Sequence, residues 1–220
     1  MPITRRAFNA ALSLTGVVAI AGFSPLRLIG PAAAQTASAA DIAHPSSLGD
    51  MALGSADAKV TIVEYASMTC PHCAAFATEV FPKLKSEYID TGKVRYIFRE
   101  FPLDLKAAAG AMLARCIGKD DAPKYFAVID ILFRSQNDWV MNNTTESLRR
   151  ISKQAGLSNE AFEACLKDQK MLDAIKETQD WAVDKLKVNS TPSFFINGQL
   201  VRGETSFDAF QKIIDPMLKA

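Results

Sequence analysis

The chain has 220 residues, 49% of them hydrophobic and 22% charged, which is enough to bury the core of one large domain or of a domain with an insertion. Its 25 basic and 24 acidic residues nearly balance, and no basic stripe with interleaved aromatic residues occurs, which argues against a nucleic-acid-binding protein. No internal repeat is present.

The first 34 residues are typical of an export signal. Arg5 and Arg6 precede an apolar stretch over residues 10–23, and the alanines at 32–34 offer a cleavage site. A second small-residue motif at 37–39 leaves the exact cut open, and the paired arginines leave both Sec and twin-arginine export open. We expect the signal to be removed and the mature protein to be soluble in the oxidising periplasm.

The segments that follow alternate between strand and helix patterns. Residues 35–50 are rich in Ala and Ser and are expected to form a linker or loose N-terminal arm. The expected elements after them are a short edge strand at 51–53, a strand at 59–66, a helix from 71 to about 90 and a strand at 94–100. Pro82 should kink this helix because proline removes one backbone hydrogen bond.

From residue 104 the hydrophobic pattern becomes helical. Helices are expected at 104–118, 121–135, 145–155, 159–168 and 169–187. Strand character returns at 193–197, and Asn197-Gly198 predicts a hairpin leading to Leu200 and Val201. A final helix at 207–218 is expected to begin after the cap residue Ser206.

This order predicts an α/β protein with a thioredoxin-like fold split by a helical insertion. Residues 51–103 and 169–220 would form the thioredoxin-like domain. Residues 104–168 would form the insertion and cover the active-site side of the sheet.

Two cysteines stand where the first strong strand passes into a helix. In the motif Cys70-Pro71-His72-Cys73 the two thiols are three residues apart, close enough to form a redox-active disulfide. Pro71 suits the first helical position, where its missing N–H costs nothing. The unpaired N–H groups of a helix N-terminus stabilise an anion, so the pKa of Cys70 should be low and Cys70 should be the nucleophile.

A zinc site is the main alternative for this motif, and it would need four ligands. The remaining candidate ligands are His44 in the arm and Cys116 and Cys165 in separate helical segments. We therefore expect no metal and no bound cofactor.

Cys116 and Cys165 allow two interpretations. They could be free thiols packed in the core, since cysteine buries readily. Alternatively they form a structural disulfide, whose loop of about 49 residues would contribute roughly 4 kcal/mol by the chain-entropy model. An oxidising compartment favours the disulfide.

Several of these features together resemble the DsbA family of thiol:disulfide oxidoreductases. They are the Cys70-Pro71-His72-Cys73 motif, the helical insertion, Pro82, and Thr191-Pro192 just before a strand. The resemblance covers essentially the whole mature chain. It implies that the Thr191–Pro192 bond is cis and faces the disulfide, and that Glu64, six residues before Cys70, is a buried acid below it.

Roles follow for these residues. His72 lies between the thiols, so its ring can donate to the Cys70 thiolate and make the disulfide more oxidising, unless it is only a residue of the helix start. A cis bond would turn the Thr191 backbone so that it can pair with a bound peptide. Glu64 would affect proton movement at Cys73, with Arg95 or Arg99 as a basic partner. The plainer alternatives are that Pro192 only begins a strand and that Glu64 reaches solvent at a strand end.

The function that the resemblance implies is the introduction of disulfides into reduced, unfolded exported proteins. A DsbB-like, quinone-linked membrane protein would reoxidise the pair, and we expect a monomer. A disulfide isomerase or reductase on the same fold is the alternative. Thr191 favours an isomerase, while Thr69, where cytochrome-maturation reductases usually have Trp, argues against a reductase. A metal-binding or surface scaffold protein is a further alternative.

Overall fold

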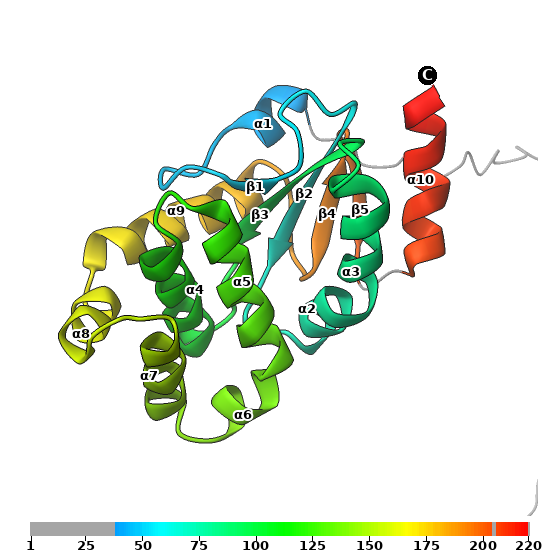
Figure 1. Ribbon diagram of the computed structural model, residues 1–220. Coiled ribbons are helices and arrows are strands. Elements are labelled where there is room, and N and C mark those ends of the chain that lie inside the picture. The colour runs from blue at the N-terminus through cyan, green and yellow to red at the C-terminus, as the bar shows by residue number, and fades with distance from the viewer. Residues whose placement is uncertain (1–37, 204–205, 220) are drawn as a thin grey trace, which may run out of the picture. The chain divides into compact units, whose positions relative to one another are not determined.

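The computed structural model describes residues 38–203 and 206–219 (Figure 1). The expected export signal and its cleavage sites up to residue 37 lie outside these ranges. Within them, none of the helices combines the length and the apolar character that a membrane span requires.

A five-stranded mixed sheet forms the centre of the fold. Its strands are β1 (Met51–Leu53), β2 (Val60–Ala66), β3 (Val94–Glu100), β4 (Ser193–Ile196) and β5 (Gln199–Arg202), in the spatial order β1-β3-β2-β4-β5. Strands β2 and β3 are parallel, and the other neighbours are antiparallel. Asn197 and Gly198 both have positive φ in the turn between β4 and β5, which confirms the predicted hairpin.

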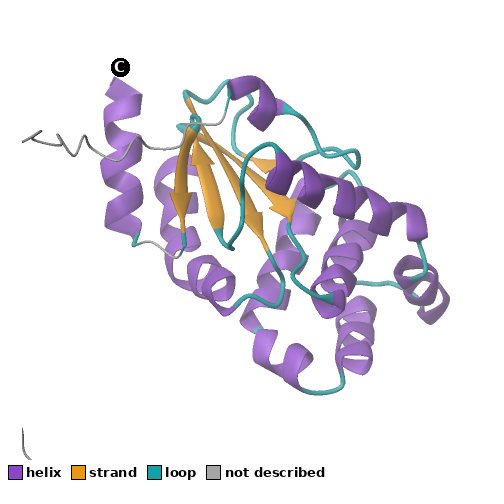
Figure 2. Cartoon of the chain, turned by 180° about the vertical axis from the view of Figure 1, so that it is seen from behind, coloured by secondary structure: helices purple, strands orange, loops and turns teal. Residues whose placement is uncertain are grey.

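The two faces of the sheet are covered by different helices. Even-numbered residues of β2 and β3 pack with the helix that follows the cysteine motif, with α5 (Ala122–Arg134) and with α10 (Phe207–Lys219). Odd-numbered residues pack with α1 (Ala39–Ala43) and α9 (Gln169–Asp184). Figure 2 shows the sheet from the side that α9 covers. Such alternation is what a strand buried on both faces requires.

The helix predicted over residues 71–90 is divided into four pieces. They are α2 (Pro71–Ala75), the π-helical η1 (Phe76–Val80), α3 (Phe81–Leu84) and the π-helical η2 (Lys85–Ile89). The Phe81 N–H donates to the Phe76 carbonyl in the turn just before Pro82. Because Pro82 cannot donate a hydrogen bond, the chain widens this turn, and the expected irregularity lies there.

Six helices lie between β3 and β4. Besides α5 and α9 they are α4 (Leu105–Gly118), α6 (Gln136–Met141), α7 (Thr144–Gln154) and α8 (Asn159–Leu166). Five begin after a side chain that accepts a backbone N–H: Asp104, Asp121, Asn143, Ser158 and Asp168. The sixth, α6, was not predicted.

The sheet and the helices around it confirm the predicted class, a thioredoxin-like fold with a helical insertion.

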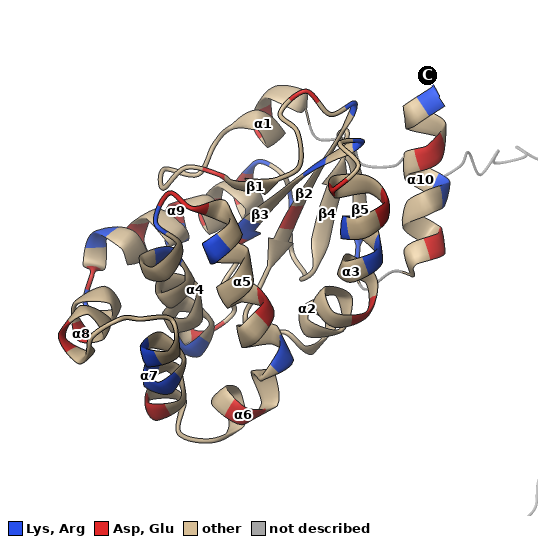
Figure 3. Cartoon of the chain, viewed as in Figure 1, with Lys and Arg blue, Asp and Glu red and all other residues tan. Residues whose placement is uncertain are grey.

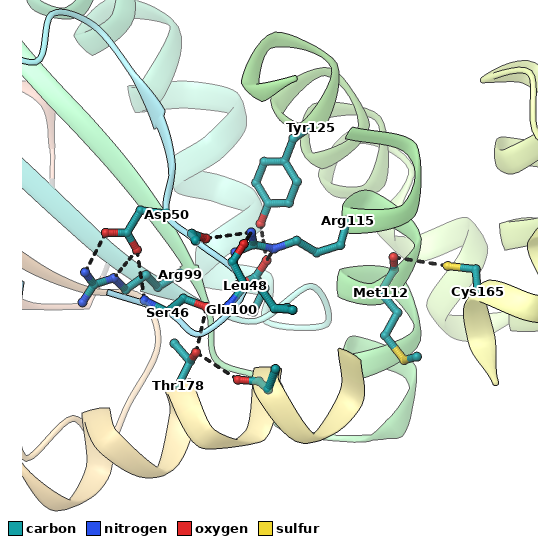
Figure 4. Close-up of polar contacts among 12 residues, drawn as sticks. Ser46, Leu48, Asp50, Arg99, Glu100, Met112, Arg115, Tyr125, Cys165 and Thr178 are labelled. Carbon is teal, nitrogen blue, oxygen red and sulfur yellow. Dashed lines mark hydrogen bonds and ion pairs between the residues drawn. The ribbon is translucent and has the colours of Figure 1, made fainter. Parts of the chain in front are cut away.

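Residues 38–50 differ from the expected loose arm. Within them α1 buries Ile42, whose carbonyl accepts from Arg99 Nη1 at 2.9 Å. Asp50 pairs with the Arg99 guanidinium through two bonds of 2.9 Å, and Arg115 Nη1 donates to the Gly49 carbonyl at 2.9 Å (Figure 4). The expectation was wrong for this segment because its carbonyls accept hydrogen bonds from two buried arginines and its Asp50 carboxylate pairs with one of them.

Candidate active site

The cysteine motif begins where β2 passes through a short loop into α2. Cys70 is the N-cap of α2, with an extended backbone (φ −77°, ψ 120°), and Pro71 takes the first helical position. Both thiols are reduced and buried, Cys70 being 6% exposed and Cys73 fully enclosed. The strand and the helix therefore fix both sulfur atoms at one helix N-terminus.

The two thiols differ strongly in acidity. The pKa of Cys70 is lowered to about 5, chiefly because the Cys73 thiol donates a hydrogen bond to its sulfur. Burial opposes this shift, and the Thr191 side chain and the backbone N–H groups of Cys73 and His72 add to it. Burial raises the pKa of Cys73. The hydrogen bond that its thiol donates to Cys70 raises it further, and so does the charge of the nearby Glu64. At neutral pH the pair is thus one thiolate and one thiol.

Thr191 and Pro192 lie against Cys70, and their peptide bond is cis. Cys70 Sγ lies 3.3 Å from the Thr191 carbonyl oxygen, to which the thiol donates when Cys70 is protonated. The Thr191 side chain also lies close enough to the Cys70 sulfur to lower its pKa. The loop before β4 therefore presents one backbone acceptor and one hydroxyl to the nucleophile.

Glu64 is buried in the middle of the sheet, 2% exposed. Burial raises its pKa to about 8, the hydrogen bond from the Tyr96 hydroxyl to Oε2 opposes this, and the Cys70 charge adds to the rise. Its Oε1 has no partner among the described residues. Glu64 is one of the residues that line a cavity of about 20 Å³, a volume sufficient for one water molecule. The alternative in which Glu64 reaches solvent does not hold.

The expected basic partner of Glu64 is absent from its face of the sheet. Glu64 is in register with Phe98 on β3, so Tyr96 lies on the same face, and Arg95 and Arg99 lie on the opposite one. Arg99 pairs with Asp50 instead. The prediction of an arginine was therefore wrong, and the period of two in β3 could have indicated Tyr96.

His72 lies at the surface, between the two cysteines of the motif. It lines a groove of about 670 Å³ together with Glu79, Lys83 and Phe207. Its backbone N–H is one of the groups that lower the pKa of Cys70. The structure thus brings Cys70, Pro71, His72, Cys73, Glu64, Thr191 and Pro192 together at the carboxyl end of β2.

Cys116 of α4 and Cys165 of α8 form a disulfide with Cα atoms 6.1 Å apart. The alternative of two free thiols does not hold. The bridge lies in the helical insertion and joins segments 49 residues apart in the sequence. Within 38–203 and 206–219, no group of three or more His, Cys, Asp or Glu side chains is arranged to hold a metal ion.

Comparison with known proteins places this site in a family. The thioredoxin family profile matches residues 46–216. A Rickettsia bellii protein with a provisional assignment as a protein-disulfide oxidoreductase is 39% identical over 150 residues, which are 68% of this chain and 57% of that protein. The crystal structure of Wolbachia pipientis alpha-DsbA1 superposes with a TM-score of 0.73 at 36% identity, covering 77% of this chain and 91% of that one.

A more distant structure supports the fold alone. BdbD from Bacillus subtilis, in its oxidised form, gives a TM-score of 0.70 at 22% identity, covering 85% of this chain and 98% of that one. The family profile covers most of the chain, and the cysteine pair, the cis proline and the helical insertion accompany it. The chain belongs to the thioredoxin superfamily and, within it, to the DsbA-like thiol:disulfide oxidoreductases.

Proposed function

We propose that the protein is a dithiol oxidase that introduces disulfides into exported proteins. The observation that carries this proposal is the asymmetry of the pair, with the pKa of Cys70 near 5 and that of Cys73 raised. A stabilised thiolate favours the reduced protein over the disulfide, so the disulfide is a strong oxidant.

The reaction proceeds in two exchanges. A client thiolate attacks Cys70 Sγ, the bond between the two sulfurs breaks, and its electron pair passes to Cys73, which takes up a proton. Glu64, whose pKa of about 8 keeps it protonated at neutral pH, supplies that proton through local exchange with water. A second client thiolate then attacks the client sulfur of the mixed disulfide and releases Cys70 as a thiolate, a good leaving group because its pKa is low.

The net change is the oxidation of two client thiols to a disulfide and the reduction of the pair. We propose that Thr191 holds the client during the exchange. Its carbonyl accepts a hydrogen bond from Cys70 only while that thiol is protonated, so it is free to pair with a client backbone once Cys70 is bonded to the client.

Exposed apolar side chains, two of them near the motif, suit unfolded clients. Leu103 is 55% exposed, Leu105 83% and Met141 76%. The Thr69 hydroxyl donates to Asp104 Oδ2 at 2.7 Å, which places the two leucines next to the loop before Cys70. On the helices seen in Figure 3, basic and acidic residues are interspersed, so these helices show no broad preference for clients of one charge.

The location and the partners belong to the same proposal. The arginines and apolar run of residues 1–34 support export to the periplasm. Catalytic turnover needs an electron acceptor, for which we propose a DsbB-like, quinone-linked membrane protein, and we propose that the oxidase acts as a monomer.

The decisive experiment is a redox titration of the mature protein against glutathione, combined with iodoacetamide alkylation across pH. We expect an equilibrium that favours the reduced protein and an alkylation rate with a midpoint near pH 5. Cys70→Ala should abolish the fast alkylation and the oxidation of reduced ribonuclease. A midpoint near that of free cysteine would exclude the proposed oxidase, and activity that survives Cys70→Ala would support a scaffold or metal-binding protein instead.

A disulfide isomerase is the second candidate, and Thr191 is the residue that favours it. A protein-disulfide isomerase from Novosphingobium aromaticivorans superposes with a TM-score of 0.66 at 25% identity. Refolding of scrambled ribonuclease, compared with oxidation of the reduced enzyme, separates the two activities. Faster refolding than oxidation would favour the isomerase.

A further inference from the structure

The segment that leads into Cys70 is held by a side chain from the helical insertion. Gln136, the first residue of α6, is buried and 7% exposed. Its Nε2 atom donates to the Met68 carbonyl at 2.9 Å and to the Cys70 carbonyl at 3.0 Å. A glutamine amide has two N–H groups, and both are directed to the backbone on either side of Thr69.

Helix α4 holds the same segment at two further points. The Thr69 hydroxyl donates to Asp104 Oδ2, while Asp104 Oδ1 accepts the Ala107 N–H at 2.8 Å as the cap of α4. At Gly110 of α4 an added Cβ would lie 3.3 Å from Met68 Cβ, so helix and loop are in close contact. The loop before the nucleophile is therefore clamped between the starts of two insertion helices.

We propose that Gln136 is a positioning residue for the nucleophile, which from the insertion holds the carbonyls of Met68 and Cys70 and so fixes the backbone that carries the Cys70 sulfur. This inference rests on the proposed role of Cys70. It also gives the insertion a direct part in the redox site, in addition to covering it.

The contact at the Cys70 carbonyl has an electrostatic consequence. That oxygen accepts the Ala74 N–H at 3.1 Å as well as the Gln136 N–H, so both of its lone pairs are used. Without Gln136 one lone pair would stay unpaired in a buried place, with the negative end of the carbonyl dipole close to the sulfur of the same residue. The dipole would destabilise the thiolate form of Cys70, whereas the uncharged thiol and the disulfide would be less affected.

A purely structural role makes a different prediction. If Gln136 only satisfied buried polar groups, its loss would lower the stability of the oxidised and the reduced protein equally. The equilibrium with glutathione depends on the difference between those two stabilities, so it would not change. The pKa of Cys70 and the redox equilibrium therefore separate the two roles.

The test compares Gln136→Leu and Gln136→Glu in the mature protein with a matched control. Gln179 of α9 also donates from Nε2 to a backbone carbonyl, that of Pro102 at 2.9 Å, outside the clamped segment. In Gln136→Leu we expect the pKa of Cys70, read from thiolate absorbance, to rise by about one unit and the glutathione equilibrium to shift about tenfold against the reduced protein. Gln136→Glu should shift both further because a carboxylate adds a like charge. Gln179→Leu should leave both unchanged.

A lowered Cys70 pKa in the wild type that stays the same in both Gln136 variants would overturn this inference alone. An ordinary Cys70 pKa in the wild type would overturn the proposed function and this inference with it. Should the variants fail to fold, NMR of the Gln136 side-chain amide in the wild type decides. Its resonances should titrate with the pKa of Cys70, and resonances that do not move through that pH range would overturn the proposal.

Discussion

Glu64 is held in surroundings that favour its protonated form. The side chain is buried, and one of its oxygens accepts from Tyr96. The pKa is about 8 in the folded protein and 4.5 as the ordinary value. The folded state therefore binds this proton more firmly than the unfolded state, and a charge on Glu64 opposes folding.

The first prediction concerns the pH dependence that follows. As pH rises from 4.5 to 8, the unfolded state loses the Glu64 proton before the folded state does, so the free energy of unfolding falls. By pH 7 this loss is about 3 kcal/mol. Glu64→Gln, which cannot ionise, should remove this part of the slope. Urea unfolding of the oxidised protein measures it, because the disulfide keeps Cys70 and Cys73 from titrating.

A wild type and a Glu64→Gln variant with the same slope between these pH values would show that Glu64 ionises normally. That result would also remove its proposed part as the proton donor to Cys73.

At the same scale the sequence predicted the reacting residues better than their partners. A cysteine pair at a strand-to-helix junction and a proline before a strand are local patterns, and the structure brings Cys70 and Pro192 together. The partner of Glu64 depends on the register of β2 with β3, which is a pairing between distant segments. Gln136 was missed for the same reason, since nothing near it in the sequence indicates a contact with Met68.

At the scale of helices, α4 and α5 approach closely at the end of α4. A Cβ added at Gly118 would lie 2.6 Å from Tyr125 Cβ and 2.8 Å from Tyr125 Cα. Helix propensity alone predicts that alanine stabilises this position by up to about 1 kcal/mol. The contact predicts the opposite sign, because the backbone of α5 would have to move.

The second prediction is that Gly118→Ala lowers the free energy of unfolding by about 1–3 kcal/mol. Chemical denaturation measures it. A stabilised Gly118→Ala variant would mean that α4 and α5 are further apart than described.

The third prediction concerns the disulfide between α4 and α8. Replacing both Cys116 and Cys165 by alanine should lower the free energy of unfolding by roughly 4 kcal/mol, because the unfolded chain loses the constraint of a long loop. Denaturation under non-reducing conditions measures this. A count of reactive thiols in the reduced wild type provides the control, and four equally reactive thiols in the non-reduced protein would contradict the bridge.

Elements with strong local signals were predicted well. The helices with a polar cap and a periodic apolar face agree with the predicted ranges to within a few residues. In contrast, α6 begins with polar, turn-forming residues, and the buried Trp139, whose Nε1 donates to the Leu132 carbonyl at 2.8 Å, anchors it by a tertiary contact. Pro82 indicated where the helix would become irregular, but no local pattern indicated that the irregularity would take the form of two π-helical turns.

For the whole molecule, the segment 38–50 joins the sheet to the helical insertion. Asp50 pairs with Arg99, which is 1% exposed on β3. The Gly49 carbonyl accepts from Arg115 of α4, whose guanidinium also pairs with Glu100 (Figure 4). The composition of this segment suggested a linker, because its small residues favour neither helix nor strand. Its actual role depends on two arginines far along the chain, which the composition could not indicate.

The fourth prediction is that Asp50→Asn lowers the free energy of unfolding by about 3 kcal/mol, since it leaves the buried Arg99 charge without its anion. Asp130→Asn is the matched control. Its partner Arg134 lies on the surface, with both side chains about half exposed, so we expect a change below about 1 kcal/mol. Equal effects of the two substitutions, measured by urea denaturation, would contradict the buried pair.

Strand β3 serves two separate purposes on its two sides. Tyr96 faces Glu64, and Arg99 faces the N-terminal segment. Inserting one residue at the start of β3 would exchange these sides, placing Arg95 beside Glu64 and Phe98 where Asp50 needs a cation. A substitution in β3 therefore affects one side of the strand, whereas a change in the length of β3 affects the contacts of Tyr96 and of Arg99 together.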